Sequence, residues 1–167
     1  MHEPIVEPLP FKGFEELIYI CDSSALINIQ DTGDLRDMRQ FSTLHPRRIR
    51  IPEPVGKEIG RQSDELRTWW INNKPILITR FLKNEEHVLH ERIAIKYAKT
   101  PFNKEGKTYP RVSDADVYAL VTAIVRHWTL VTDDEGMKAV CRQSDHNASS
   151  LSSTKFIQII KRSSMEN

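Results

Sequence analysis

Four acidic residues of this 167-residue chain stand where their carboxylates could be brought together. Asp22 directly follows the apolar run at residues 17–21, and Asp134 follows a second apolar run. Glu58 lies on an expected early helix, and Asp116 lies in the first turn of a later one. Carboxylates held close together repel one another unless cations neutralise them, and hard oxygen ligands are those that Mg²⁺ and Mn²⁺ prefer. The four acids therefore predict a divalent-metal site.

Each acid taken alone also has an ordinary structural explanation. Asp22 can cap a helix, Glu58 can be a solvated helix residue, and Asp134 can form a turn. Asp116 can complete a capping box with Ser113. These explanations account for the acids one at a time. They do not explain why four acids stand at the ends of predicted strands or on the helices beside them.

Helices and strands are expected to alternate along most of the chain. Apolar runs predict strands at residues 17–21, 49–51, 76–81 and 130–132 and near Leu151. Helical spacing predicts helices at 25–29, 35–44, 63–74, 85–99, 113–127, 135–141 and 154–162. Pro52 and Pro54 allow another helix to begin within the next residues and to run through Val55, Glu58 and Ile59. Ser23 or Ser24 is expected to cap the first helix, and Pro75 to separate a helix from a strand. Such a series predicts a parallel sheet flanked by helices, with the functional site outside the carboxyl ends of its strands.

The composition fits one globular domain without a membrane span. The chain is 39% hydrophobic and 28% charged, and no apolar run approaches the roughly 20 residues of a membrane-spanning helix. The first residues lack the basic start and apolar stretch of a signal peptide, so a cytoplasmic location is expected. We divide the chain into a proline-rich arm at 1–14, a domain at 15–162 and a tail at 163–167.

Basic residues are concentrated although the net charge is only +1. They gather in HPRRIR at 45–50, at 96–111 and at 155–162. A basic surface around an acidic site suits a polyanionic substrate, and the alternative is solvated charge on an ordinary surface. Three residues of the loop before the helix at 113 are candidates for phosphate contacts, against the alternative of a solvated loop: Lys104, Lys107 and Arg111.

Four segments resemble the acidic motifs of the PIN-domain family, in the family's order. They are YICDSSALINI at 19–29, IPEPVGKEI at 51–59, SDADVYALVTAI at 113–124 and LVTDDEGM at 130–137. The resemblance covers about residues 18–160 and implies a three-layer α/β fold with a central, mainly parallel sheet flanked by helices. It also implies that the metal-binding and catalytic acids are Asp22, Glu58, Asp116 and Asp134, with Ser24 and Thr132 as supporting hydroxyls.

The resemblance implies an activity as well. PIN domains are typically metal-dependent ribonucleases, and many small prokaryotic ones are VapC-type toxins paired with an antitoxin protein. We therefore expect an endoribonuclease that uses Mg²⁺ or Mn²⁺, with RNA as substrate, an antitoxin as partner, and homodimerisation. The loop at 100–112 and the N-terminal arm exceed the compact toxin pattern. The alternative is a catalytically silent PIN-like module that binds RNA or protein.

Within this reading the acids have different expected roles. Asp22 and Asp116 are expected to bind metal directly, Asp134 to bind a second metal or its water, and Glu58 to position water or act as a general base. Asp133 and Asp114, the close neighbours of two of these acids, are expected to have supporting roles. Enzymes of the haloacid dehalogenase type need a second Asp two positions after the first, where this chain has a serine.

Overall fold

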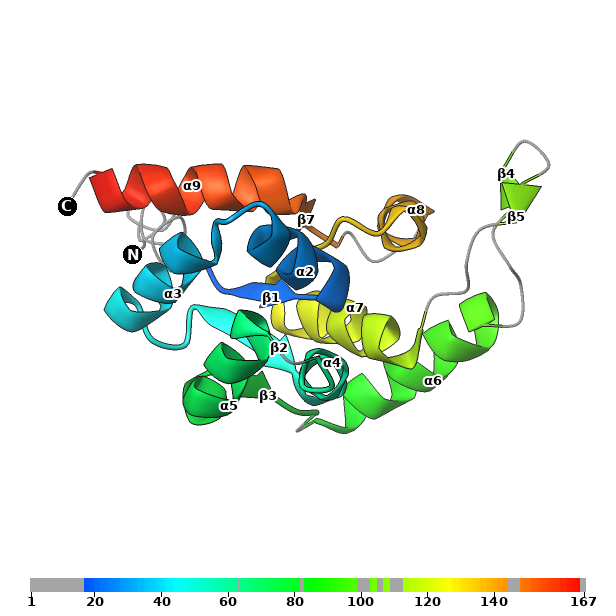
Figure 1. Ribbon diagram of the computed structural model, residues 1–167. Helices are drawn as coiled ribbons and strands as arrows, with labels where there is room; N and C mark the ends of the chain where they lie inside the picture. The colour runs from blue at the N-terminus through cyan, green and yellow to red at the C-terminus, as the bar shows by residue number, and fades with distance from the viewer. Residues whose placement is uncertain are drawn as a thin grey trace, which may run out of the picture.

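A five-stranded sheet forms the centre of the protein. The structure is a computed structural model that describes residues 17–62, 64–81, 83–98, 103–104, 107–108, 113–143 and 148–165. The strands of the sheet are β1 (Tyr19–Cys21), β2 (Ile49–Pro52), β3 (Ile78–Thr79), β6 (Thr129–Val131) and β7 (Ser150–Leu151). Their order is β3-β2-β1-β6-β7, and every neighbouring pair is parallel (Figure 1). The expected parallel sheet flanked by helices is thereby confirmed.

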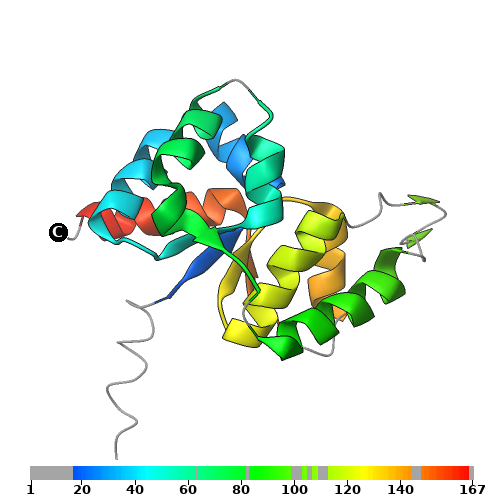
Figure 2. The same cartoon turned by 90° about the horizontal axis from the view of Figure 1, so that it is seen from below.

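Helices cover both faces of the sheet and pack into two hydrophobic clusters (Figures 1 and 2). The first cluster contains residues of α2 (Ser23–Asp31), α3 (Leu35–Leu44), α4 (Glu53–Ile59), α5 (Glu65–Leu77) and α9 (Ser153–Met165). The second contains residues of α6 (Asn84–Ala98), α7 (Asp114–Arg126) and α8 (Glu135–Gln143). No helix in the described part of the chain is long and apolar enough to cross a membrane.

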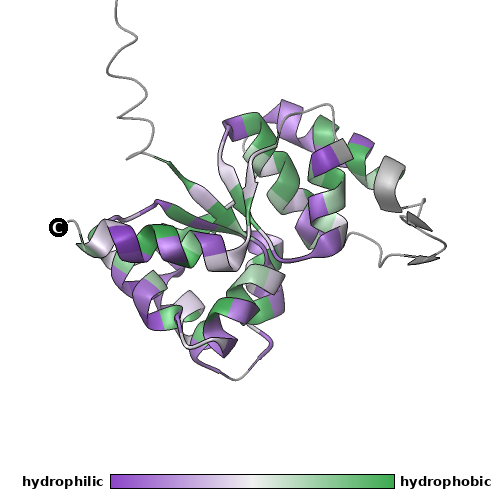
Figure 3. Cartoon of the chain, turned by 90° about the horizontal axis from the view of Figure 1, so that it is seen from above, coloured by the Kyte–Doolittle hydropathy of each residue, from purple (hydrophilic) through white to green (hydrophobic). Residues whose placement is uncertain are grey.

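The central strand shows how the sequence divides between these clusters. Tyr19 and Cys21 belong to the first cluster and Ile20 to the second, as expected when successive side chains of a strand point to opposite faces. All three residues are buried, so the continuous apolar run reflects a strand covered on both sides. Helices that border solvent instead alternate between hydrophobic and hydrophilic residues (Figure 3), whereas α7 is buried or half-buried along all but its first residue.

The expectation that Pro75 separates a helix from a strand is wrong. Helix α5 continues through Pro75 to Leu77, and β3 contains only Ile78 and Thr79 instead of the expected residues 76–81. Proline removes one N–H from the helix, so the carbonyl of Ile71 loses its helical donor. Ile71 lies on the exposed side of α5, where water can take the place of that donor.

The expected cap of the first helix is also wrong. Asp22, and neither Ser23 nor Ser24, is the N-cap of α2, and its side chain accepts a hydrogen bond from the Ala25 N–H. The backbone of Asp22 is still extended, whereas Ser23 is already the first helical residue. The strand thus ends one residue before the helix begins, and Asp22 occupies the junction.

Several expected features lie wholly or partly outside the described residues. These are the arm at 1–14, Lys99, Arg111 and most of the loop at 100–112. Of that loop the structure describes β4 (Asn103–Lys104) and β5 (Lys107–Thr108), which pair as antiparallel strands. Helix α9 continues to Met165, three residues beyond its expected end.

The register of the sheet brings two strand ends level with each other. Cys21 of β1 pairs with Val131 of β6, so Asp22 and Thr132 leave the sheet side by side. Strand β1 lies between β2 on one side and β6 on the other, so the helices that follow these strands begin around a common edge. In parallel sheets this carboxyl edge is where ligands bind.

Candidate functional site

Asp22 is the most buried acid at the carboxyl edge of the sheet, with no solvent-exposed surface. Its Oδ1 accepts hydrogen bonds from Ser24 Oγ at 2.8 Å and from the Ala25 N–H at 3.0 Å, and its Oδ2 accepts one from Thr132 Oγ1. The pKa of Asp22 is raised to about 6, mainly by burial and to a smaller extent by the charge of Asp116, whereas these hydrogen bonds act to lower it. The carboxyl group of Asp22 is therefore held in one position, although its ionised form is electrostatically unfavourable there.

Two hydroxyl groups connect Asp22 to the loop after β6. Thr132 Oγ1 donates to Asp22 and accepts a hydrogen bond from the Asp134 N–H at 3.1 Å. Ser24 Oγ likewise donates to Asp22 and accepts one from the Asp133 N–H at 3.2 Å. Each hydroxyl therefore donates a hydrogen bond to Asp22 and accepts one from the backbone after β6. These bonds hold the end of β1 and the loop after β6 together.

Asp116 lies in the first turn of α7 and forms a capping box with Ser113. The Asp116 N–H donates to Ser113 Oγ, and Asp116 Oδ2 accepts from the Ser113 N–H at 3.3 Å. Burial raises the pKa of Asp116 to about 6, and the charges of Asp134 and Glu58 contribute to the same direction. Its other oxygen, Oδ1, forms no hydrogen bond to the described residues.

Asp134 and Glu58 approach this site from two further elements. Asp134 Oδ1 accepts a hydrogen bond from the Met137 N–H at 2.9 Å at the start of α8, and Asp134 is half-buried. Glu58 lies near the end of α4, where its Oε1 accepts from Ser23 Oγ at 3.3 Å. Ser23 adjoins Asp22, so this contact holds the α4 acid against the beginning of α2.

The position of α4 depends on a glycine. A Cβ at Gly56 would lie 2.0 Å from Cζ2 of Trp70, far inside van der Waals contact. The Trp70 indole, which is 4% exposed, therefore packs directly on the α4 backbone. Gly56 precedes Glu58 by two residues, so this close packing also places the acid.

The structure thus brings Asp116 within electrostatic reach of each of the other three predicted acids. All four are carboxylates, so the chemistry of the donor set fits a hard divalent cation. Within the described ranges, however, no three Asp, Glu, His or Cys side chains are arranged to hold a metal ion as they stand. Metal binding would require these side chains to rotate toward a common point, using oxygens that do not cap a helix.

The neighbouring acids Asp133 and Asp114 lie in different surroundings. Asp133 accepts hydrogen bonds from Asn28 Nδ2 at 2.8 Å and from the Ser153 N–H at 2.9 Å, so its carboxylate joins α2 to α9. Burial alone would raise its pKa, but these hydrogen bonds outweigh burial and lower it. Asp114 is exposed, and its Oδ1 lies 2.9 Å from His90 Nε2 of α6.

Sequence reasoning missed two polar contacts around the acids. Ser23 was considered only as a helix cap and Asn28 was not singled out, although they contact Glu58 and Asp133. The signal for Ser23 was available, because it lies between the strand-end acid and a serine expected to support it. Asn28 had no such signal, since its partner lies 105 residues away in the sequence.

One hollow lies away from the acids. It has a volume of about 570 Å³ and is lined mainly by residues of α3, with Gln30 of α2 and Glu65 of α5. None of the four acids lines it, so the candidate site rests on the carboxylate cluster and not on cavity size.

Comparison with known proteins supports the fold. Residues 19–145 match the model of a family described as a domain of unknown function, DUF4411. A comparison with curated proteins gave no match. Among solved structures, VapBC-1 from nontypeable Haemophilus influenzae aligns with a TM-score of 0.56 and 13% identity, covering 83% of this chain and 99% of that chain. PAE2754 from Pyrobaculum aerophilum aligns with a TM-score of 0.53 and 13% identity, covering 87% and 98%. These similarities show a PIN-like, VapC-type fold.

Proposed function

Because this chain belongs to the DUF4411 family, whose description assigns no activity, we propose its function from the site: a divalent-metal-dependent endoribonuclease. The observation that carries the proposal is the placement of the acids: hydrogen bonds through Thr132 and Ser23 join the segments of Asp22, Asp134 and Glu58 at the carboxyl edge of the sheet. Asp22 and Asp116 both have a pKa raised to about 6, and other acids of the cluster contribute to each shift. Like charges gathered beside buried groups are typical of functional sites.

The residues would divide the work of phosphodiester hydrolysis. Asp22 and Asp116 would hold Mg²⁺ or Mn²⁺ directly, and Asp134 would hold a second ion or its water. Glu58 positions the attacking water or accepts its proton. A metal bound there would lower the pKa of that water and would neutralise charge on the phosphoryl and leaving oxygens. Ser24 and Thr132 keep Asp22 oriented through the hydrogen bonds described above.

The proposal includes a partner. The likeness to a VapBC-1 structure supports an antitoxin protein as the partner of this chain. We further propose that the chain is the toxin of a cytoplasmic toxin–antitoxin pair and that it assembles as a homodimer. Co-expression with the protein encoded by the adjacent gene tests this part separately. We expect that protein to copurify with the chain and to suppress RNA cleavage.

The direct test is cleavage of single-stranded RNA by purified protein. We expect cleavage with added Mg²⁺ or Mn²⁺ and none in excess chelator, because hard carboxylates are the metal donors. The Asp116→Asn protein, purified in the same way, serves as the control for contaminating nucleases. Equal cleavage with metal and with chelator would reject the metal mechanism, and equal cleavage by the variant would reject the site.

One observation favours a second candidate, a silent PIN-like module that binds RNA or protein. Three of the four acids already serve helix starts, and no three of the described side chains are arranged to hold metal. Calorimetric titration with Mn²⁺ separates the two candidates when read beside the cleavage assay. A nuclease binds the metal and cleaves, whereas the silent module leaves RNA intact even when RNA is bound.

A further inference from the structure

A second charged region lies on the sheet face that α7 covers, away from the acids. Arg50 of β2 pairs with Ile20, and residues paired across parallel strands point to the same face. Arg50 therefore shares the face of Ile20, which belongs to the cluster formed with α7. Its guanidinium carbon lies 6.0 Å from the centre of the Trp128 ring, and that of Arg126 lies 5.0 Å from the same ring.

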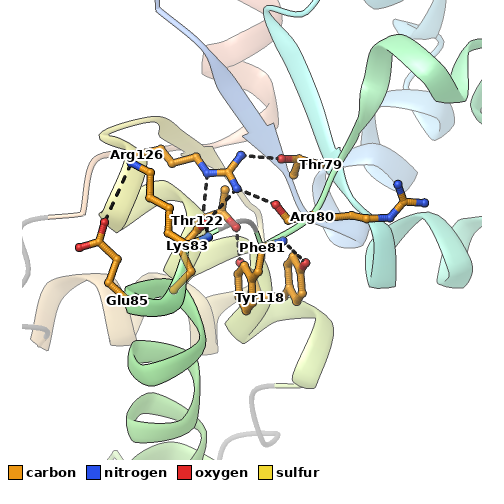
Figure 4. A network of polar contacts seen from close by, with 9 residues as sticks. Thr79, Arg80, Phe81, Lys83, Glu85, Tyr118, Thr122 and Arg126 are labelled. Carbon is orange, nitrogen blue, oxygen red and sulfur yellow. Dashed lines mark hydrogen bonds and ion pairs between the residues drawn. The ribbon is translucent and has the colours of Figure 1, made fainter.

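The two arginines beside Trp128 differ in their partners. Arg126 donates four hydrogen bonds. Its Nε and Nη2 donate to the two carboxylate oxygens of the buried Glu86. Its Nη1 donates to Thr79, and its Nη2 also donates to the carbonyl of Arg80 (Figure 4). Its charge therefore has a carboxylate beside it. This is the usual arrangement for a guanidinium with little solvent exposure.

Arg50 has no such carboxylate. Within the described part of the chain it forms no ion pair with any acid, and its one hydrogen bond there runs from Nη2 to the carbonyl of Ile78 at 2.6 Å. Its Nε is buried without an acceptor. Burial lowers the pKa of Arg50, and the charges of Arg47 and Arg126 lower it further. The partly buried guanidinium of Arg50 thus has two other guanidinium groups near it, those of Arg47 and Arg126.

Arg47 adds an exposed guanidinium to this region. It lies in the turn before β2 with a φ of 71°, a left-handed conformation that few residues other than glycine adopt. It is close enough to contribute to the lowered pKa of Arg50. Within the described residues it forms no ion pair, so its donors remain available for a ligand.

We propose that Arg47 and Arg50 form a binding site for a phosphate group. A buried charge without a counter-ion is costly, and an anion beside Arg50 would remove that cost. Guanidinium groups match phosphate oxygens with paired, charge-assisted hydrogen bonds. Trp128 would form the wall of the site beside Arg50, whose guanidinium carbon lies 6.0 Å from the centre of its ring. The site does not involve the four acids, so it stands or falls independently of the ribonuclease proposal.

The test follows the Trp128 indole N–H resonance by NMR during titration with inorganic phosphate, against sodium chloride at equal ionic strength. A Trp128→Phe variant assigns the resonance among the three tryptophans of the chain. We expect a saturable shift with phosphate in the wild-type protein. Arg50→Gln and Arg47→Gln should each reduce the apparent affinity at least about tenfold, which corresponds to one lost charge-assisted contact. Arg67→Gln, an exposed arginine on α5, is the matched control and should leave the shift unchanged.

Two results would overturn the proposal: no saturable shift in the wild-type protein, or an unchanged affinity in the variants. Arg47 is exposed, so Arg47→Gln remains informative even if Arg50→Gln fails to fold. A parallel titration with a short single-stranded RNA in excess chelator identifies the source of the phosphate. Tighter binding of RNA than of inorganic phosphate assigns the site to an RNA backbone, and the reverse order assigns it to free phosphate.

Discussion

The carboxyl edge of the sheet and the face beneath the end of α7 present the same electrostatic problem with opposite signs. At the first, the buried Asp22 and the half-buried Asp116 lie near other acids, and the pKa of each rises to about 6. At the second, Arg50 is partly buried beside other arginines, and its pKa falls. Arg126, which shares the second region, has Glu86 as a counter-ion. Arg126 and Arg50 therefore differ in their counter-ion and not in burial alone. We use a charged group buried near like charges, without a counter-ion, as the criterion for a candidate ligand-binding site.

The largest expected effect separates adjacent acids of the carboxyl edge. Asp116→Asn and Asp134→Asn should reduce RNA cleavage at least about 10³-fold, because each removes charge that would hold a metal. Asp114→Asn and Asp133→Asn should retain activity within about tenfold of wild type, since Asp114 is exposed and Asp133 joins α2 to α9. Side-by-side rates of the four proteins provide the measurement. The reverse ranking within either pair would show that the wrong acid has been assigned.

The next effect concerns stability and compares the two arginines beside Trp128. Arg126→Met should lower the free energy of unfolding by about 3–5 kcal/mol, because it takes the guanidinium away from the buried Glu86 carboxylate. Arg50→Met should change it by no more than about 1 kcal/mol, since it removes a charge that has no counter-ion. Denaturant unfolding at neutral pH measures both. Equal losses in the two variants would contradict the distinction between the regions.

The smallest effect is a pH dependence of the metal-free protein. The folded pKa of Asp116 is about 6, above its ordinary 3.8, so the folded state keeps its proton where the unfolded chain has released it. This contribution to the free energy of unfolding is present below pH 4 and is lost as the pH rises to 6. The loss should amount to about 1–3 kcal/mol. Unfolding measured from pH 4 to 7 should therefore show a steeper fall in wild type than in Asp116→Asn.

Other acids also make the free energy of unfolding depend on pH. Hydrogen bonds lower the pKa of Asp133, for example, so its contribution to that free energy rises with pH instead of falling. The difference between wild type and Asp116→Asn isolates the one carboxyl group. At pH 7 the variant should be more stable by about 1 kcal/mol, although it is expected to be inactive. Adding Mn²⁺ should stabilise the wild type and leave the variant nearly unchanged. A variant that is less stable at pH 7 would argue against repulsion among the acids.

Local patterns predicted most of the fold. Helix α3 begins and ends at the expected Leu35 and Leu44, because its apolar spacing is clear and no proline interrupts it. Asp22 could be placed at a strand end since an apolar run precedes it. The failure at Pro75 arose because a proline near the end of a helix removes only one hydrogen bond there. Tertiary packing, with Leu77 fully buried, then keeps the last turn helical.

The site was less predictable where it depends on distant partners. The bond from Thr132 to Asp22 spans 110 residues, and only a resemblance to known motifs placed both in one site. The pair of Arg126 with Glu86 and the contact of Gly56 with Trp70 gave no sequence signal. Neither pairing follows from local periodicity, because each joins elements that meet only in the folded chain.

The double use of the acids has a consequence for how this site could be lost during evolution. Asp22 caps α2, Asp116 closes the capping box of α7, and Asp134 accepts a hydrogen bond from the first turn of α8. A descendant released from selection for activity would still need acceptors at these helix starts. Asn or Ser satisfies that need, whereas Ala does not. An inactive descendant should therefore carry Asn or Ser at these positions, so that its sequence would still resemble that of an active enzyme.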